Sequence, residues 1–225
     1  MIDWAAGEGT AIALRFLVYL DLLLLAGLLL GARRTVPDEV PSRVIAGLAV
    51  AGAVLTLVQL PTTALAMTGG DAAVLDSEML RLIALETQMG LSGIARFSLL
   101  TMLAITAAGA PRARALHTLL ALAGLAALAW NGHAGASEGS AGTLHRASDI
   151  LHLIAASAWL GTLALLLRAL TRPSHTPADL IAALRRFAVT GTLIVGTLLV
   201  TGAVNLWGIA GLDSLPKLAS SDYGR

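Results

Sequence analysis

The chain has 225 residues, of which 56% are hydrophobic and only 13% are charged. Soluble domains average about 45–50% apolar and about 25% charged residues, so the composition indicates an integral membrane protein. A net charge of +1 provides no electrostatic footprint for nucleic acid. The absence of cysteine excludes disulfides, thiolate metal sites and cysteine nucleophiles, and leaves His and Met as the soft metal ligands.

The apolar stretches predict an all-α bundle of transmembrane helices. A membrane-spanning helix needs about 20 mostly apolar residues, and about six stretches of the chain meet this length. We expect one membrane domain over 1–225. In chain order the expected spans are 10–32, 44–67, 91–109, 113–131, 147–169 and 187–209.

The segment between the second and third expected spans has a different pattern. Leu75, Met79 and Leu82 recur at roughly helical spacing with acidic residues between them. We expect an amphipathic helix at about 75–89 that lies on the membrane surface; a re-entrant segment is the alternative.

The distribution of arginines predicts the orientation. Arginine clusters follow the first, third and fifth expected spans, whereas the alternate segments are acidic or mixed. Loops rich in Lys and Arg face the cytoplasm. The N-terminus, the 68–90 loop and the 131–146 loop are therefore expected outside, which in a Gram-negative inner membrane is the periplasm.

Three of the five histidines gather in NGHAGASEGSAGTLHRASDILH, residues 131–152. In a helix His145, Asp149 and His152 are spaced i, i+4, i+7 and share one stripe. Seven residues place His145 and His152 about 10 Å apart along the axis, too far for both to bind one ion directly. His133 ends the preceding span at the same outer face.

Two geometries of this stripe remain open. A helix that begins near Ser148 would leave His145 in the loop, free to fold back with His133 onto His152. A helix that begins near Thr143 would make His152 a deeper site with His145 at its mouth. In both, we expect Asp149 to orient the second ring nitrogen of His152, as metal-bound histidines usually require. The alternative is that these are interfacial polar groups satisfied by water and head groups.

Methionines are expected at the same outer level. Met67 ends the second span, and Met89 follows the amphipathic segment. Thioether and imidazole ligands together suit copper, especially Cu(I), although methionine is also an ordinary core residue. His117 and His175 lie toward the cytoplasmic side, and we assign them no role.

Four further polar residues fall within expected spans, namely Arg15, Asp21, Arg96 and Asn205. Ionisable residues inside a membrane are costly and mark functional sites by default. They either form structural ion pairs, such as Asp21 with Arg96, or line a polar path or a proton-linked gate. No Ser-His-Asp setting, phosphate loop or HExxH motif occurs, so we do not expect an enzyme.

Several motifs resemble one family. They are NGHA at 131–134, ASDILHLIAASAWLGTL at 147–163, RRFAVTGTLIVGTLLVTGAVNLWG at 185–208 and the terminal DYGR. In the first half, MTG at 67–69, TQMG at 87–90 with Arg96, and RFLVYLDLLLLAG at 15–27 add to them. In this order they resemble the CopD/PcoD family of bacterial inner-membrane copper resistance proteins, most strongly over 131–225.

The resemblance implies copper transport across the inner membrane toward the cytoplasm, with a small periplasmic CopC-like copper-binding protein as a partner. The presumed family ligands map onto His133, His152 and Met67, with His145 and Met89 as further candidates. Family members usually continue for about two more helices after the YGR motif, so we expect that this chain lacks the last helices.

Two other functions remain open. A b-type haem protein of membrane electron transfer would need two histidines at one depth on facing helices. A membrane scaffold for a periplasmic copper chaperone would bind its partner without moving copper. The leading hypothesis is a multi-pass inner-membrane protein that captures Cu(I) or Cu(II) at a periplasmic His/Met site and passes it inward.

Overall fold

The computed structural model describes residues 8–31, 40–67, 71, 76–131, 139–171 and 176–210. This part of the chain is helical almost throughout and contains no strand. The helices in chain order are α1 (Glu8–Gly31), α2 (Ser42–Met67), α3 (Ser77–Glu86), α4 (Gln88–Gly109), α5 (Arg114–Ala126), the 3₁₀ turn η2 (Ala127–Trp130), α7 (Gly139–Leu170) and α8 (Pro177–Ala210).

Five of these helices, α1, α2, α4, α7 and α8, are long and apolar enough to cross a membrane. The fourth expected span, 113–131, instead forms a shorter helix in two parts, 13 residues of α5 and four of η2. These rise by about 27 Å together, slightly less than the roughly 30 Å hydrocarbon core. The expectation of six full-length spans is therefore not confirmed, while the all-helical, multi-pass architecture is.

The last two helices are longer than expected. α7 has 32 residues and begins at Gly139 rather than 147, and α8 has 34 residues and begins at Pro177 rather than 187. At 1.5 Å per residue they measure about 48 and 51 Å, well over the hydrocarbon thickness. The apolar pattern alone marks only their membrane-embedded parts, because the polar turns at their ends remain helical.

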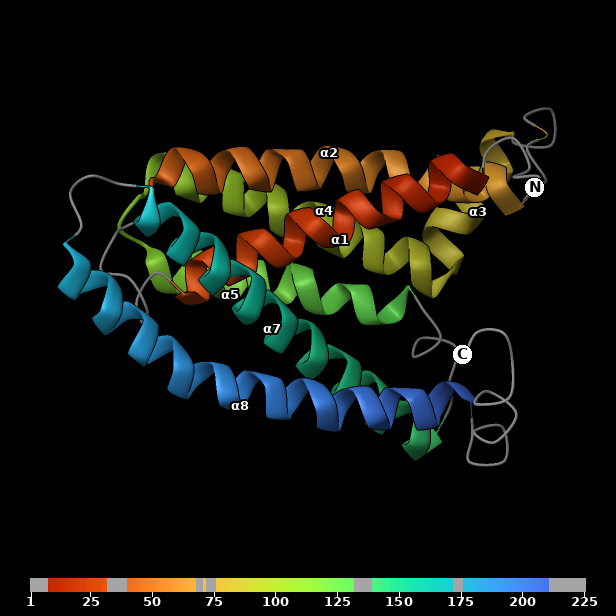
Figure 1. Ribbon diagram of the computed structural model, residues 1–225. Helices are drawn as coiled ribbons and strands as arrows, with labels where there is room; N and C mark the ends of the chain where they lie inside the picture. Colours follow the sequence, from red (N-terminus) through yellow and green to blue (C-terminus); the bar gives the residue numbers. More distant parts are fainter. Residues whose placement is uncertain are drawn as a thin grey trace.

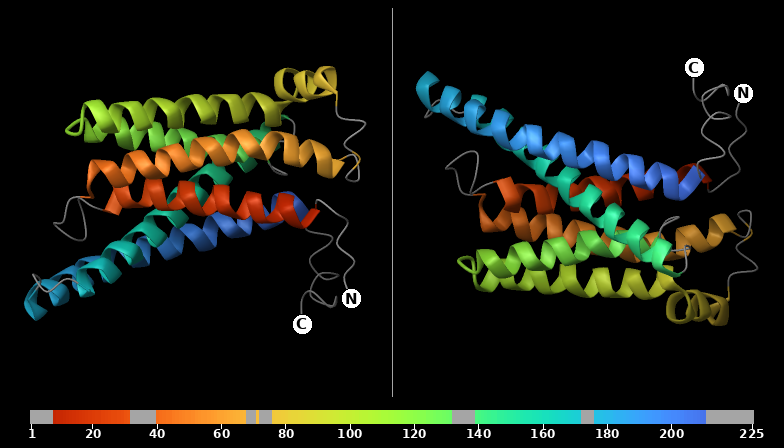
Figure 2. Two further views of the ribbon diagram at one scale, coloured as in Figure 1. Left: turned by 90° about the horizontal axis from the view of Figure 1, so that it is seen from above. Right: turned by 90° about the horizontal axis from the view of Figure 1, so that it is seen from below.

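The helices form a bundle with two parts (Figures 1 and 2). α1, α2, α4 and α5 lie side by side, and their facing side chains form the core, with Leu22, Ile45 and Leu100 fully buried. α7 crosses α1 obliquely, and α8 packs chiefly against α7. We call the end of the bundle that holds α3, η2 and the start of α7 the α3 end.

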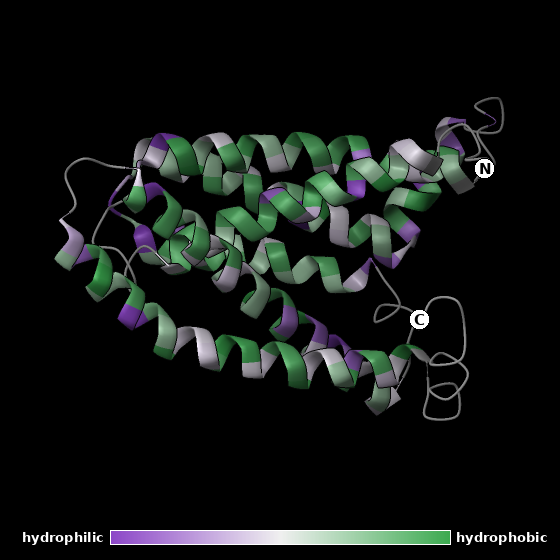
Figure 3. Ribbon diagram, in the orientation of Figure 1, coloured by the Kyte–Doolittle hydropathy of each residue, from purple (hydrophilic) through white to green (hydrophobic). Residues whose placement is uncertain are grey.

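Hydrophobic residues extend along most of each long helix (Figure 3), and many of them are exposed on the outside of the bundle. On α8, for example, the exposed fraction is 71% for Val189, 71% for Leu193 and 70% for Leu199. Such a surface is unfavourable in water and suits lipid tails. The fold is therefore that of a multi-pass membrane protein.

Two glycines allow α1 and α7 to cross in direct backbone contact. A methyl group at Gly27 would meet the carbonyl oxygen of Ser157 and the backbone of Gly161, and one at Gly161 would meet the backbone of Gly27. Small residues at a crossing let helices in a membrane approach closely, where dispersion contacts hold them together. The position of α7 on the bundle therefore depends on the absence of side chains at Gly27 and Gly161.

We predict that Gly161→Ala lowers the stability of the purified protein by about 1–3 kcal/mol, because the added methyl group forces two backbones apart. Thermal unfolding in detergent measures the change. The matched control is Gly47→Ala on α2, where a methyl group meets nothing within 4 Å, so stability should stay equal or rise by up to about 1 kcal/mol. Equal melting temperatures for Gly161→Ala and the wild type would contradict the proposed crossing.

Candidate functional site

The histidine stripe lies on α7, near the α3 end. Because α7 begins at Gly139, His145 lies in its second turn and His152 lies two turns deeper. The geometry in which the helix begins near Ser148 is therefore wrong. Ser148 is buried within the helix, and its hydroxyl donates to the carbonyl oxygen of Thr201 on α8 at 3.2 Å. Of the two expected geometries, the structure favours the one with His152 below His145.

His152 is oriented by a threonine that the sequence pattern did not single out. Its Nδ1 lies 2.9 Å from Oγ1 of Thr201. The single hydroxyl hydrogen of Thr201 is donated within α8, to the carbonyl oxygen of Thr197 at 2.6 Å. Nδ1 of neutral His152 must therefore be the donor to Thr201, which leaves the lone pair of Nε2 for another partner.

His145 is almost fully buried, at 6% exposure, and faces α8. A methyl group at Gly208 would lie about 3 Å from the imidazole ring, at 2.9 Å from Nδ1. Nδ1 is buried without a hydrogen-bond partner among the described residues. The ring borders a cavity of about 280 Å³ between α7 and α8, lined by Ala141, Leu144, His145, Val204, Trp207 and Gly208. The His145 ring thus borders this cavity, and its Nδ1 packs against Gly208.

Asp149 lies between the two histidines and interacts electrostatically with both. Its Oδ1 accepts a hydrogen bond from Nδ2 of Asn205 on α8 at 3.4 Å. The ring nitrogen that we expected Asp149 to orient is instead bonded to Thr201. The structure, which describes both side chains, contains no hydrogen bond between Asp149 and His152, and the orientation of His152 by Asp149 stays a prediction. We refer to His145, Asp149 and His152 as the α7 cluster.

A second polar cluster surrounds Arg96 on α4, which is 1% exposed. Its Nε donates to Oγ1 of Thr56 at 3.1 Å and its Nη2 to Oε1 of Gln59 at 2.9 Å, both on α2. With the amide of Asn131 oriented so that its nitrogen donates to Ser92, its oxygen accepts from Nη1 and Nη2 of Arg96 at 3.1 and 3.3 Å. Arg96 is therefore held by neutral oxygen acceptors from α2 and from the end of η2. We call these five residues the Arg96 cluster.

The expected pair of Asp21 with Arg96 does not form in the structure. Asp21 is 7% exposed, and its Oδ2 has no hydrogen-bond partner among the described residues. Arg15 is exposed on the outside of α1, and Asn205 belongs to the α7–α8 side. The four residues expected to line a path are thus separated, although Tyr19 on α1 lies within electrostatic range of both Asp149 and Arg96.

The remaining expected ligands are placed only in part. His133 lies outside the described residues, and the side chain of Met67 at the end of α2 is likewise not described. Met89 lies in the first turn of α4, half-buried, and its carbonyl oxygen accepts from Ser92 at 3.0 Å. Within the described part of the chain, no three His, Asp or Glu side chains form a metal-binding group. His145 and His152 share one helix, so by themselves they do not provide the facing pair that a haem requires.

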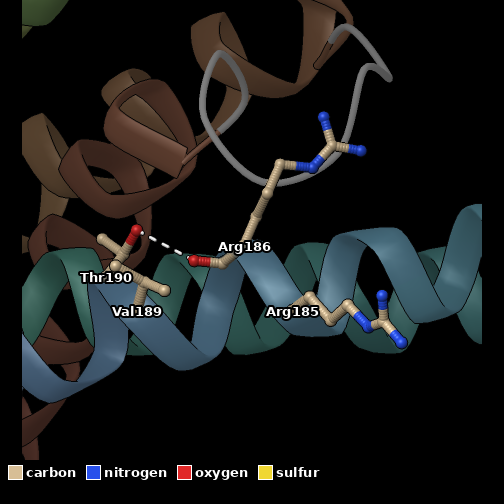
Figure 4. A pocket seen from close by; sticks show the side chains of 4 residues that line it. All are labelled: Arg185, Arg186, Val189 and Thr190. Atoms are coloured by element: carbon tan, nitrogen blue, oxygen red, sulfur yellow. Dashed lines mark hydrogen bonds between the residues drawn. The ribbon is translucent and has the colours of Figure 1, made fainter.

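A separate surface depression of about 520 Å³ lies near the start of α8, lined by Arg185, Arg186, Val189 and Thr190. Figure 4 shows the two arginine side chains extending in different directions from the helix. The hydroxyl of Thr190 is bonded within α8, to the carbonyl oxygen of Arg186 at 3.1 Å. This depression lies in the first half of α8, whereas the α7 cluster packs against the second half, so the depression is not part of the candidate site.

The two partners of Arg96 on α2, Thr56 and Gln59, have a signal that sequence patterns can reveal. Together with Gly52 they are spaced i, i+4, i+7, so the three residues form one stripe of small and polar residues on an otherwise apolar helix. Thr201 has no such signal, since a single threonine in an apolar helix usually bonds its own backbone.

The fold and the two clusters define a multi-pass membrane protein with buried polar groups and with two imidazoles on α7 near the α3 end. A family model described as "Copper resistance protein D-like, N-terminal domain" matches residues 1–143. Copper resistance protein D of Pseudomonas syringae pv. tomato is 33% identical over 233 aligned positions, which cover 95% of this chain and 74% of that protein. No solved structure matches the chain.

The chain belongs to the copper resistance protein D-like family. This membership confirms the family expected from the motifs and supports a role in copper resistance or homeostasis. The stretch expected to resemble the family most, 131–225, lies mostly beyond the residues that the family model matches, so that expectation stays untested.

We predict that Gln59→Leu lowers the free energy of unfolding by about 1–3 kcal/mol, because it leaves the buried Nη2 of Arg96 without its acceptor on α2. Thermal unfolding in detergent tests this. Thr101→Val is the control, since the Thr101 hydroxyl bonds only its own helix, at the carbonyl oxygen of Phe97, and should change stability by less than about 0.5 kcal/mol. An equally small effect of Gln59→Leu would show that Arg96 does not need this acceptor.

Proposed function

We propose that the protein transports copper across the bacterial inner membrane, capturing it at the α3 end and passing it toward the cytoplasm. The observation that carries the proposal is the state of the two imidazoles on α7. One ring nitrogen of His145 is buried and unpaired, and the bond of His152 to Thr201 leaves its Nε2 lone pair available. An imidazole binds a metal through such a lone pair.

In this proposal the α3 end faces the periplasm. The loops and helix ends at the opposite end include Arg112, Arg114 and Arg168, whereas α3 and its N-cap contain three acids, Asp76, Glu78 and Glu86, against one cation, Arg81. This distribution follows the positive-inside rule. The acidic α3 end also suits the approach of a copper ion or of a CopC-like periplasmic carrier.

Copper is the substrate in this proposal, and its ligands are imidazole and thioether groups. Met67, Met89 and His133 would take the ion first, since Met67 ends α2, Met89 lies in the first turn of α4, and His133 lies in the sequence between η2 and α7. His145 would follow at the entrance of α7, and His152 would hold the ion two turns deeper. Soft Met and His ligands favour Cu(I). Binding weakens as the pH falls, because protons compete with the metal for imidazole nitrogens.

We predict that His133→Ala combined with His152→Ala abolishes copper uptake into vesicles that contain the purified protein and lowers copper binding at least about tenfold. The double variant removes one proposed capture ligand and the deeper ligand together. Copper inside the vesicles, measured by elemental analysis against time, gives the rate.

The control variant is His175→Ala, which removes a histidine that lies in the sequence between α7 and α8 and should leave uptake unchanged. Unchanged copper binding in the double variant would contradict the ligand assignment. Binding of copper or of a periplasmic carrier by the wild type, without any uptake, would favour the scaffold function over transport.

A second variant tests the orientation of His152. Thr201→Val removes the oxygen that accepts from Nδ1 and should lower copper affinity about 10- to 100-fold, the usual effect of losing the partner of a ligating histidine. Thr201→Ser keeps the hydroxyl and should retain wild-type affinity. Calorimetric titration of the purified variants with copper measures both. Equal affinities of the Val and Ser variants would contradict the role of this hydrogen bond.

A further inference from the structure

The carboxyl group of Asp21 occupies the middle of the bundle. It lies 13 residues after the start of α1 at Glu8 and ten residues before its end at Gly31, about 20 and 15 Å from the two helix ends. Its side chain is 7% exposed, and Oδ2 is buried without a hydrogen-bond partner among the described residues. No described residue of the α7 cluster bonds to this oxygen, so we treat the role of Asp21 as separate from that of the cluster.

The backbone of α2 leaves room for this carboxyl group. A methyl group at Gly52 would collide with Oδ2 of Asp21 and would lie 3.2 Å from the side chain of Leu100 on α4. Asp21 therefore lies where α1, α2 and α4 meet, in space that exists because position 52 has no side chain. Any larger residue at 52 would displace the carboxyl group.

Among the residues that the structure describes, no cation bonds to the buried oxygen of Asp21. Arg43 is the only charged residue of α2 and lies nine residues, or about 14 Å, before Gly52. Arg96 is the only charged residue of α4, and its recorded hydrogen bonds go to Thr56, Gln59 and Asn131.

The other groups that face α1 do not neutralise Asp21 either. On α1 itself, Arg15 is exposed and Tyr19 lies toward Arg96 and Asp149. α5 carries Arg114 and His117 near its start, and α7 carries the α7 cluster with Arg146 and Arg168. None of them donates a hydrogen bond to Oδ2 of Asp21.

A carboxylate that is buried in an apolar interior without a partner is strongly unfavourable, and binding a proton removes its charge. We propose that Asp21 is a proton-binding site of the bundle. The carboxylate takes one proton from water to become the neutral acid and returns it to water on release. Nothing else is consumed in this step.

The Arg96 cluster provides the route to this site. Gly52, Thr56 and Gln59 form one stripe of α2, which leads from Asp21 past Arg96 to Asn131 at the α3 end. With Asp21 neutral, Arg96 stays on its neutral acceptors, as in the structure. The use of this proton to drive copper movement rests on the proposed function, whereas the proton site itself does not.

Infrared spectroscopy of the protein in lipid vesicles tests the site without copper. We expect the carbonyl stretching band of a protonated carboxylic acid at pH 7, lost in Asp21→Asn and retained in Asp149→Asn. We also expect Gly52→Ala, in which a methyl group is forced against the carboxyl group, to shift the band. This last variant and the wild type decide the question even if Asp21→Asn fails to fold.

The proposal is overturned if the wild type has no such band at pH 7, if the band persists in Asp21→Asn, if it is lost only in Asp149→Asn, or if Gly52→Ala leaves its frequency unchanged. A second measurement addresses coupling. With the outer pH held at 7, the rate of copper uptake should depend on the pH inside the vesicles for the wild type and lose that dependence in Asp21→Asn. Absence of uptake in the wild type contradicts the transport function and leaves the infrared result to decide the proton site.

Discussion

The contact of Gly27 with Gly161 is the interaction on which the rest of the arrangement depends. It fixes where α7 crosses α1, and α8 is attached to the bundle chiefly through α7. His145 and His152 belong to α7, while Thr201, Asn205 and Gly208, which contact the α7 cluster, belong to α8. Two residues without side chains thus set the position of every described imidazole at the α3 end.

The bilayer explains why the buried polar groups are arranged in clusters. Lipid tails offer no hydrogen bonds, so each buried polar group must find its partner on a neighbouring helix or bear the cost of lacking one. Arg96 has partners from α2 and η2, and His152 has one from α8. Among the described residues, Asp21, His117, His145 and Asn205 each retain a buried atom without a hydrogen-bond partner. Two of these four, Asp21 and His145, are groups to which we assign the binding of a proton and of copper.

Much of the fold was predictable from the sequence, because hydrophobic length alone identifies a membrane helix. Five of the expected spans correspond to long helices, and the segment near 75–89 forms α3 with Asp76 as its N-cap. The start of α7 was not predictable, since the glycine-rich segment before Thr143 has weak helix propensity and the helix still begins at Gly139.

Predicting the site was harder, for a different reason. The spacing of His145, Asp149 and His152 on one helix follows from the sequence, and the structure retains it. Their partners come from another helix, and the pairing of α7 with α8 depends on tertiary packing that no local pattern encodes. The predicted Asp21–Arg96 pair was wrong. Opposite charges within one bundle suggested an ion pair, but the guanidinium group of Arg96 instead bonds to Thr56 and Gln59 on α2.

The hydrogen bond between His152 and Thr201 joins α7 to α8, so it depends on how these two helices are positioned along each other. Thr201 presents its oxygen to Nδ1 only while α8 keeps its register along α7. If α8 slides by one turn, about 5.4 Å, the bond breaks and the imidazole is free to rotate and to exchange its tautomer. The affinity of His152 for an ion would thus depend on the position of α8, so that movement of α8 would change how tightly α7 binds the ion.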